Sequence, residues 1–149
     1  IAKALAGEAL PVYGDGKQVR DWLFVADHCE AIRTVLAKGR VGETYNVGGN
    51  AEKQNLEVVQ AICALLDARR PRADGISRAS QITFVADRPG HDRRYAIDAS
   101  KLRDELGWVP KYDFERGIAE TIDWYLNNQD WVQRVLDGSY RLERIGGVA

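Results

Sequence analysis

The sequence has 149 residues, a length typical of one domain, and its 21 Lys and Arg residues nearly balance its 22 Asp and Glu residues. This balance argues against a protein that binds nucleic acid by bulk electrostatic attraction, because that mode needs a strongly basic face. No apolar run approaches the roughly 18 residues of a membrane-spanning helix and no signal-peptide pattern opens the chain, so we expect no nucleic-acid partner, no membrane and a cytoplasmic location.

The first residues indicate a piece of a longer polypeptide. The sequence contains no Met, and it starts at Ile1 within what reads as the end of a helix closed by Gly7. Two cysteines, Cys29 and Cys63, lie among apolar neighbours in helix-like stretches. We expect both to be buried free thiols, because two isolated cysteines without a His at ligand spacing favour neither a disulfide nor a metal site.

Four elements are predicted in the first third of the chain. Aromatic and β-branched residues predict two short strands at 10–13 and 19–25, separated by the Gly14-Asp15-Gly16 turn. Apolar residues at helical spacing predict a helix over 26–38, and the segment ETYNV at 43–47 predicts a buried strand. The turn is not a dinucleotide fingerprint, because its glycines have the wrong spacing and no helix follows at once.

The middle of the chain predicts a helix, a loop and two strands. Asn55 is a favoured helix cap, and an apolar stripe follows it at helical spacing. Arg, Pro, Asp and Ser dominate 68–80, which predicts an exposed loop. Strand-like runs occupy 81–86 and 93–97.

The last third predicts helices only. Asp98 or Ser100 caps a short helix that ends at Gly107, and two longer helical patterns cover 113–127 and 129–137. Strands that alternate with helices indicate an α/β fold, although two of the strands lie close enough in sequence to form a separate small sheet.

A basic loop directly follows the strand at 81–86. Residues 87–98 read DRPGHDRRYAID, in which the basic side chains are those of Arg88, His91, Arg93 and Arg94. Arg offers a fork of donors that suits phosphate oxygens, and His adds a donor whose charge changes near neutral pH. Pro89 and Gly90 favour a turn that presents these groups from a loop. The alternative is a solvated loop whose charges pair with Asp87 and Asp92, and the spacing alone favours neither.

Other candidate binding residues lie at strand ends and at a helix start. Tyr13 could stack on a planar base and Arg20 could bind a phosphate, or both could belong to an ordinary strand. The Asn55 amide could reach a phosphate at the start of its helix. Gly48-Gly49 either admits a ligand to the backbone or simply turns the chain. His28 reads as a structural histidine.

Catalytic patterns are missing from the sequence. We find no nucleophile–base pair, no glycine-rich phosphate loop that opens a helix, no metal cluster and no Tyr-x-x-x-Lys pair. The chain therefore reads as one that binds an anion and does not transform it, with no catalytic residue and no metal ligand.

Four segments together resemble a known family. They are LPVYGDGKQVRDWLFVADH at 10–28, GETYNVGG at 42–49, the Asn55-Leu56 helix start, and QITFVADRPGHDRRYAIDASKL at 81–102. In order and spacing they resemble the C-terminal half of the dTDP-glucose 4,6-dehydratases, which belong to the extended short-chain dehydrogenase/reductase family. The resemblance runs from about residue 1 to residue 138.

The resemblance implies a fold and a reaction. Residues 1–149 would be the C-terminal substrate-binding portion, with the last strands and helices of a Rossmann-type sheet, and the NAD-binding Rossmann portion would precede it. The complete lyase, a homodimer in this family, would use bound NAD to convert dTDP-glucose to dTDP-4-keto-6-deoxyglucose and water, a step towards rhamnose and related deoxysugars. The NAD fingerprint, the Tyr-x-x-x-Lys pair and the acid/base pair would lie in the preceding portion, so this chain alone would be inactive.

The resemblance also assigns substrate contacts. The thymidine end would meet Pro11, Val12 and Tyr13. The diphosphate and its surroundings would be held by Arg20, Asn55, Arg88 and His91. The loop itself would be shaped by Asp87, Pro89 and Gly90. Two alternatives remain: a related sugar-nucleotide epimerase or decarboxylase, which shares a looser form of the pattern, and a non-catalytic nucleotide-binding module.

Overall fold

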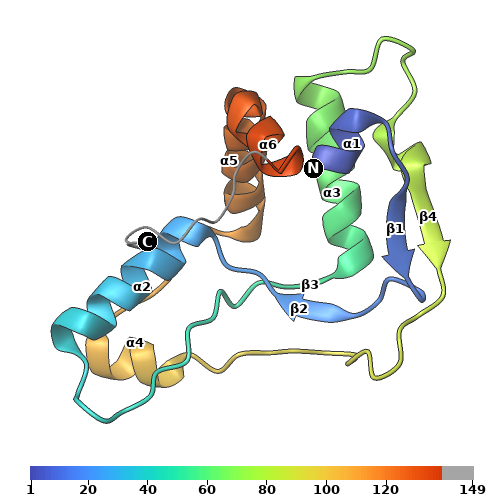
Figure 1. The fold of residues 1–149 in the computed structure, drawn as a ribbon. Coiled ribbons are helices and arrows are strands. Elements are labelled where there is room, and N and C mark those ends of the chain that lie inside the picture. The colour runs from blue at the N-terminus through green and yellow to red at the C-terminus, as the bar shows by residue number, and fades with distance from the viewer. Residues whose placement is uncertain (139–149) are drawn as a thin grey trace, which may run out of the picture.

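The computed structural model describes residues 1–138 of the chain (Figure 1). The α-helices are α1 (Ala2–Ala6), α2 (Val25–Lys38), α3 (Asn55–Arg69), α4 (Ser100–Leu106), α5 (Phe114–Asn127) and α6 (Gln129–Leu136). The strands are β1 (Leu10–Tyr13), β2 (Val19–Asp21), β3 (Glu52–Gln54) and β4 (Ile82–Val85), and a 3₁₀ turn, η1 (Arg78–Gln81), precedes β4. The predicted α/β class is confirmed.

The four strands form two separate pairs. β1 and β4 are parallel, with Leu10 opposite Ile82 and Tyr13 opposite Val85. β2 and β3 are antiparallel, and Val19 also forms a single parallel bridge with Arg94. In Figure 1 the carboxyl ends of β1 and β4 point to the edge where β2 and β3 lie and where α3 begins. The fold thereby gathers loops from four distant parts of the sequence at one edge.

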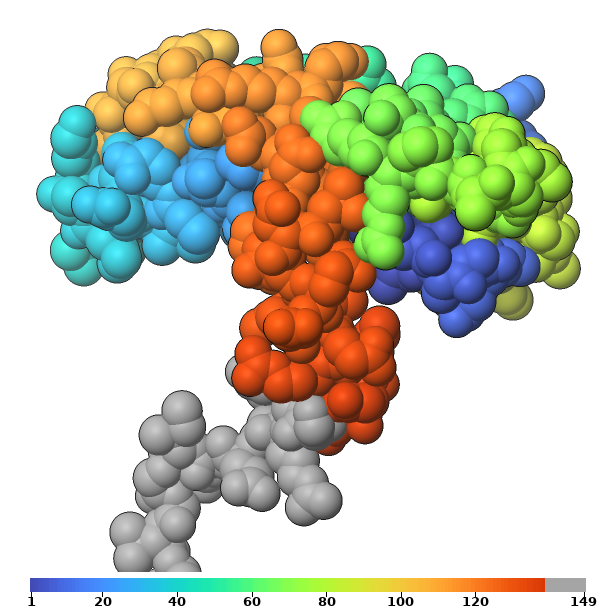
Figure 2. All heavy atoms as spheres, turned by 90° about the horizontal axis from the view of Figure 1, so that it is seen from above, coloured from blue at the N-terminus to red at the C-terminus, as the bar shows by residue number. Residues whose placement is uncertain are grey.

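Two hydrophobic cores support this edge. The first unites α1, α3 and α5 through the buried side chains of Ala4, Leu66 and Ile122. The second joins α2 to α4 and the segment after it through Ala31, Leu102 and Trp108. Figure 2 shows the two lobes side by side, with α5 and α6 projecting from them as a stalk. Small cores of this kind leave much apolar surface exposed.

Several strand predictions are wrong, for one physical reason. Residues 43–47 belong to no strand, although Tyr45 and Val47 pack against the second core, and 93–97 contributes only the bridge at Arg94. The strand at 19–25 ends at Asp21, and β3 was not predicted. A strand needs a hydrogen-bonded neighbour, and the apolar pattern of one segment does not say whether a neighbour exists.

The helix predictions at 26–38, 113–127 and 129–137 are confirmed to within a residue or so, because periodic apolar stripes are local signals. The cap of α3 was wrongly placed. Gln54 is the cap, its backbone N–H donates to the Glu57 carboxylate at 2.7 Å in a capping box, and Asn55 is the first helical residue. Ser100 donates its backbone N–H to Asp98 at 2.9 Å, so Asp98 does satisfy the start of α4.

The loop at 68–80 is not wholly exposed. It contains the start of η1, where the Arg78 side chain is only 5% exposed and meets Asp67 of α3 at 2.8 Å. Cys63 is buried as predicted, whereas Cys29 is exposed, so the prediction for Cys29 is wrong. The face of α2 that carries Cys29 turns to solvent because the second core occupies only the opposite face.

Large apolar side chains remain exposed on the outer helices. Leu36 of α2 is 82% exposed, and Trp124 and Trp131 of α5 and α6 are 45% and 43% exposed. The two tryptophan rings lie edge to face at 5.1 Å. None of the helices within residues 1–138 is both long enough and apolar enough to cross a membrane.

The Gly48-Gly49 pair has a structural explanation. Asp21 accepts hydrogen bonds from the backbone N–H groups of Gly49 and Ala51, both at 2.8 Å, which draws this segment against Trp22. A Cβ on Gly49 would lie 2.2 Å from the Trp22 carbonyl oxygen, closer than any real contact.

We therefore expect Gly49→Ala to lower the free energy of unfolding by about 1–3 kcal/mol, the usual cost of overpacking. Chemical denaturation with far-UV circular dichroism measures this difference. An unchanged denaturation midpoint would show that the close approach of the two backbones is not needed for stability.

Candidate functional site

Asp87, directly after β4 and Ala86, connects three segments at the edge described above. One carboxylate oxygen accepts the Arg88 backbone N–H at 2.9 Å and lies 2.6 Å from His91 Nδ1. The other accepts the Gln18 side-chain N–H at 3.1 Å. The hydrogen bond with His91 holds the pKa of Asp87 below its ordinary value, despite some desolvation, so the group is a carboxylate near neutral pH. Asp87 therefore fixes the 87–91 loop to the turn after β1.

His91 is held in a defined position. Its side chain is only 7% exposed, and its ring meets the exposed ring of Tyr13 edge to face, with 6.4 Å between centroids. Because Asp87 occupies Nδ1, the other ring nitrogen, Nε2, is the one left for a further partner. Tyr13 and His91 thus form a continuous aromatic surface at the ends of β1 and β4.

The positive charges of Arg20 and Arg88 both affect the pKa of Tyr95. The Arg20 guanidinium lies over the Tyr95 ring at 4.4 Å and donates to the backbone oxygens of Val19 and Asp92 at 2.7 and 3.1 Å. The Tyr95 hydroxyl is hydrogen-bonded to Asp92, which raises its pKa, and the charges of Arg20 and Arg88 oppose that shift. Neither arginine forms an ion pair with a carboxylate of residues 1–138. We call Arg20, Arg88, His91 and Tyr95 the basic surface.

The other two arginines of the loop are neutralised. Arg93 pairs with Asp15 at 2.9 Å, and Arg94 forms a two-pronged pair with Glu52, both contacts at 2.8 Å. The solvated-loop alternative therefore holds in part: His91 pairs with Asp87 as that alternative expected, Arg93 and Arg94 pair with other acidic residues, and no ion pair of Arg88 is found within residues 1–138.

Asn55 reaches this region through Gln18. The backbone N–H of Asn55 donates to the Gln18 carbonyl at 2.9 Å, and the next residue, Leu56, donates to Gly16 at 2.9 Å. The first turn of α3 is therefore fixed against the 14–18 turn, beside Asp87. The first backbone N–H groups of α3 are therefore used within the chain, and what the helix start can offer an anion is its dipole and the Asn55 side-chain amide.

The remaining predicted residues occupy different positions. Pro11 and Tyr13 are exposed, whereas Val12 is only 4% exposed and lies beneath Gly16. Pro89 is exposed, and Gly90 has a φ of 68°, in the left-handed region that favours glycine. His28 lies exposed on α2.

The roles of two residues in this region are not indicated by the sequence. Gln18 looks like an ordinary polar residue after a turn, yet it is 2% exposed and joins Asn55 to Asp87. Tyr95 falls within a predicted strand, where an aromatic residue needs no special explanation. Both roles depend on contacts between segments that are distant in the sequence, so no local pattern could have revealed them.

The contact between Asp87 and His91 predicts a dependence on pH. A carboxyl whose pKa is depressed in the folded state contributes its stabilisation above its ordinary pKa of 3.8 and loses it as the pH falls through the lower folded value. We expect the NMR signal of the Arg88 amide, which donates to Asp87, to change only below pH 3.8 through loss of this contact. Loss of the contact at a higher pH would contradict the assignment.

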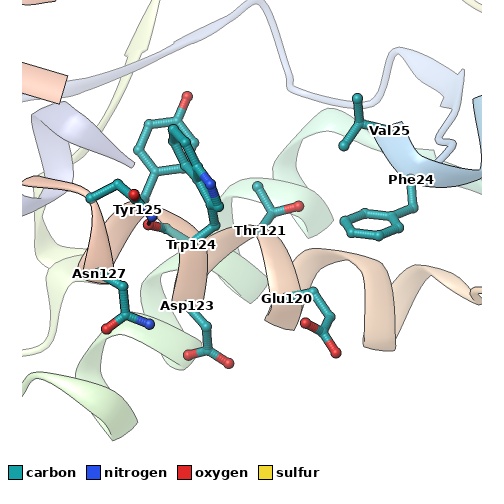
Figure 3. Close-up of a pocket in the computed structure, with 9 residues that line it drawn as sticks. Phe24, Val25, Glu120, Thr121, Asp123, Trp124, Tyr125 and Asn127 are labelled. Carbon is teal, nitrogen blue, oxygen red and sulfur yellow. Dashed lines mark hydrogen bonds between the residues drawn. The ribbon is translucent and has the colours of Figure 1, made fainter. Parts of the chain in front are cut away.

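The cavity shown in Figure 3 does not coincide with the basic surface. It has a volume of about 530 Å³ and lies between Phe24–Val25 and α5, where Thr121, Trp124 and Tyr125 face it. Its lining contains carboxylates and no Lys, Arg or His. An anionic ligand would be repelled there, so charge rather than volume identifies the basic surface as the better site for phosphate.

Comparison with known proteins gives consistent matches. A family model described as GDP-mannose 4,6 dehydratase matches residues 1–121. The dTDP-glucose 4,6-dehydratase of Xanthomonas campestris pv. campestris is 84% identical over 146 residues, which are 98% of this chain and 42% of that protein. The dTDP-glucose 4,6-dehydratase of Bacillus anthracis, solved in complex with NAD, aligns with a TM-score of 0.74 at 53% identity and covers 87% of this chain. That of Streptomyces venezuelae, solved with NAD and TYD bound, has the same TM-score at 42% identity and covers 87% of this chain.

The chain matches only part of each relative. The chain spans 42% of the length of the curated Xanthomonas relative and 38% of each of the two solved chains. What the complete relatives do is therefore not automatically a property of these 149 residues.

Proposed function

The chain belongs to the GDP-mannose 4,6 dehydratase family, and on that premise we propose that it forms the nucleotide-sugar-binding part of a dTDP-glucose 4,6-dehydratase. The family description refers to a guanine nucleotide, but the 84% identity to a dTDP-glucose enzyme favours thymidine. The complete protein would convert dTDP-glucose to dTDP-4-keto-6-deoxyglucose and water.

The observation that carries this proposal is the pair of arginines without a carboxylate partner. Arg20 lies over the ring of Tyr95, the charge of Arg88 lowers the pKa of the same tyrosine, and Arg88 shares its loop with His91, while the neighbouring Arg93 and Arg94 are neutralised. Two guanidinium forks and an imidazole suit the oxygens of a diphosphate, because charged hydrogen bonds to phosphate are strong and geometrically specific. A ligand would exchange the backbone contacts of Arg20 for phosphate oxygens.

The other predicted residues receive roles around the diphosphate. Tyr13 offers an exposed ring on which the thymine base can stack, next to Pro11, while Val12 supports the strand from below. Asn55 adds the donor of its side-chain amide for a phosphate oxygen, because its backbone N–H already donates to Gln18. The loop that carries Arg88 and His91 is shaped by Asp87, Pro89 and Gly90.

Related structures contain NAD, but residues 1–138 do not supply the main NAD-binding motif. Gly14 and Gly16, with φ of 58° and 70°, form the turn from β1 towards β2, and no helix begins at this turn. A dinucleotide site requires a glycine-rich turn that leads from a strand into a helix, so that the pyrophosphate meets the helix N-terminus. We therefore assign no cofactor contact and no catalytic residue to residues 1–138.

Binding at the diphosphate nevertheless contributes to catalysis. Contacts remote from the reacting carbons orient the sugar, and part of their binding energy lowers the barrier of the reaction. The role proposed for this chain is to position the glucose ring for groups supplied from elsewhere.

Isothermal titration of the chain with dTDP, thymidine, UDP and GDP tests the proposal. We expect dTDP to bind, thymidine to bind much more weakly for want of the diphosphate, and GDP to bind more weakly than dTDP. Equal affinities for dTDP and UDP would favour a related epimerase or decarboxylase. No binding of any nucleotide would contradict the proposed function.

Two further expectations concern the assembly and the cellular location of the complete enzyme. We propose that the complete enzyme is a homodimer and works in the cytoplasm on a small nucleotide sugar. Light scattering of the complete enzyme checks the first expectation, and cell fractionation checks the second.

A further inference from the structure

A buried glutamine lies behind the basic surface. Gln18 is 2% exposed, its side-chain Nε2 donates to Asp87 at 3.1 Å, and its carbonyl accepts the Asn55 N–H at 2.9 Å. A carboxylate can only accept hydrogen bonds, so the amide nitrogen and not the amide oxygen must face Asp87. The Gln18 Oε1 atom is then buried without a hydrogen-bond partner among the described residues. The orientation of this amide is thus fixed by Asp87 alone.

Asp87 passes this constraint to His91. Its two oxygens face opposite neighbours, Oδ2 the Gln18 amide and Oδ1 the His91 ring at 2.6 Å. Because a carboxylate has no proton to donate, His91 Nδ1 must carry the hydrogen of this contact. A Cβ on Gly14 would lie 2.8 Å from Asp87 Oδ2, so the chain also confines the carboxylate from the side of the turn.

We propose that Gln18 is a positioning residue that acts through Asp87. It holds the carboxylate in the rotamer that accepts the hydrogen of His91 Nδ1, so that Nε2 is the nitrogen that faces the nucleotide diphosphate and donates to it in the imidazolium form. The backbone carbonyl of the same residue holds Asn55, so Gln18 contacts two binding groups, His91 through its side chain and Asp87, and Asn55 through its main chain. The functional half of this inference rests on the proposed nucleotide-sugar site.

The chain offers a matched control. Gln81 is also a buried glutamine, 9% exposed, whose Nε2 donates one hydrogen bond, to the Glu8 carbonyl at 2.6 Å, and whose Oε1 has no partner among the described residues. It lies at the other end of the β1–β4 pair, next to the Leu10–Ile82 register position. Gln18→Met and Gln81→Met therefore remove the same group from similar burial, and only the first touches Asp87.

The first measurement is ¹⁵N NMR of the imidazole rings at alkaline pH, which distinguishes the two neutral tautomers. The chain contains only two histidines, and a His28→Gln background leaves His91 as the only signal. We expect the Nδ1–H tautomer in this background and in Gln81→Met, and a mixture of tautomers in Gln18→Met. Asp87→Asn should give a mixture as well, because an amide can donate as well as accept.

The second measurement is the affinity for dTDP by titration calorimetry. We expect Gln18→Met to weaken binding about 3- to 10-fold, within the range of one hydrogen bond, and Gln81→Met to leave it unchanged. Amide spectra check that each variant is folded. Gln18→Asn and Gln18→Glu extend the series. The shorter amide of Gln18→Asn should restore the Nδ1–H tautomer of His91 in part. Gln18→Glu should not restore it, because it places a second carboxylate against Asp87.

The outcomes separate this inference from the proposed function. A pure Nδ1–H tautomer in Gln18→Met would overturn the inference, as would equal losses of affinity in Gln18→Met and Gln81→Met. If the unsubstituted chain does not bind dTDP, the proposed function fails, and the tautomer of Gln18→Met still decides whether Gln18 positions His91.

Discussion

Replacing Asp67 by alanine is expected to lower the free energy of unfolding by about 2–4 kcal/mol, because the change leaves a buried guanidinium without its counter-charge. Arg78 is 5% exposed, meets the Asp67 carboxylate at 2.8 Å and also donates to the Ala4 carbonyl at 3.3 Å. Burial raises the pKa of Asp67, but hydrogen bonds from Ser77 and Arg78 outweigh it and keep the pKa below its ordinary value. This group therefore joins α3, η1 and α1 while it is ionised.

Urea denaturation followed by circular dichroism measures the effect of Asp67→Ala. The control is Asp74→Ala, because the Arg72–Asp74 pair has similar chemistry in the same loop but is more exposed, and exposed pairs contribute little. We expect the control to remain close to the unsubstituted chain. Equal denaturation midpoints for the two variants would contradict a special role for the buried pair.

Replacing Arg20 by alanine is expected to weaken dTDP binding 10- to 100-fold, about 1.5–3 kcal/mol for a charged hydrogen bond. Arg20 extends from β2 over the Tyr95 ring, and its hydrogen bonds within the chain are to backbone oxygens rather than to carboxylates. A phosphate can therefore take up its donors without breaking an ion pair. Arg20→Lys should recover only part of the affinity, because an ammonium lacks the planar fork.

Arg93→Ala is the matched control for Arg20→Ala. Arg93 belongs to the same edge and carries the same charge, but Asp15 neutralises it in the unliganded chain. Titration calorimetry at fixed salt compares the two variants, because any loss of positive charge weakens anion binding to some degree. Losses of equal size would indicate a diffuse electrostatic effect and would count against a specific Arg20 contact.

The sequence predicted the helices better than the strands. The apolar stripes of α2, α3 and α5 are local patterns. Each of these helices starts within about one residue of its predicted position. The segment ETYNV at 43–47 looks like a strand, but no described segment pairs with it. Strand pairing depends on partners that are distant in sequence, and no local pattern names those partners.

The site was predictable in part, for a similar reason. The types of side chain in residues 87–98 are compatible with phosphate binding and with a solvated loop, and only the family resemblance proposes Arg20 and Asn55 as partners of Arg88 and His91. Which arginines are neutralised is a tertiary property: Glu52 reaches Arg94 from β3, and Asp15 reaches Arg93 from the turn. The link through Gln18 also exists only once β2, α3 and the loop have come together.

The central claim is that side chains from separate segments bind one diphosphate together. It is tested most directly by an NMR titration of the isotope-labelled chain with dTDP, in which amide and side-chain signals are followed. We predict that the largest shifts fall on Tyr13, Arg20, Arg88 and His91 together, with one common dissociation constant. Shifts confined to the cavity beside Trp124, or spread over unrelated faces with different dissociation constants, would mean that these side chains do not hold one ligand.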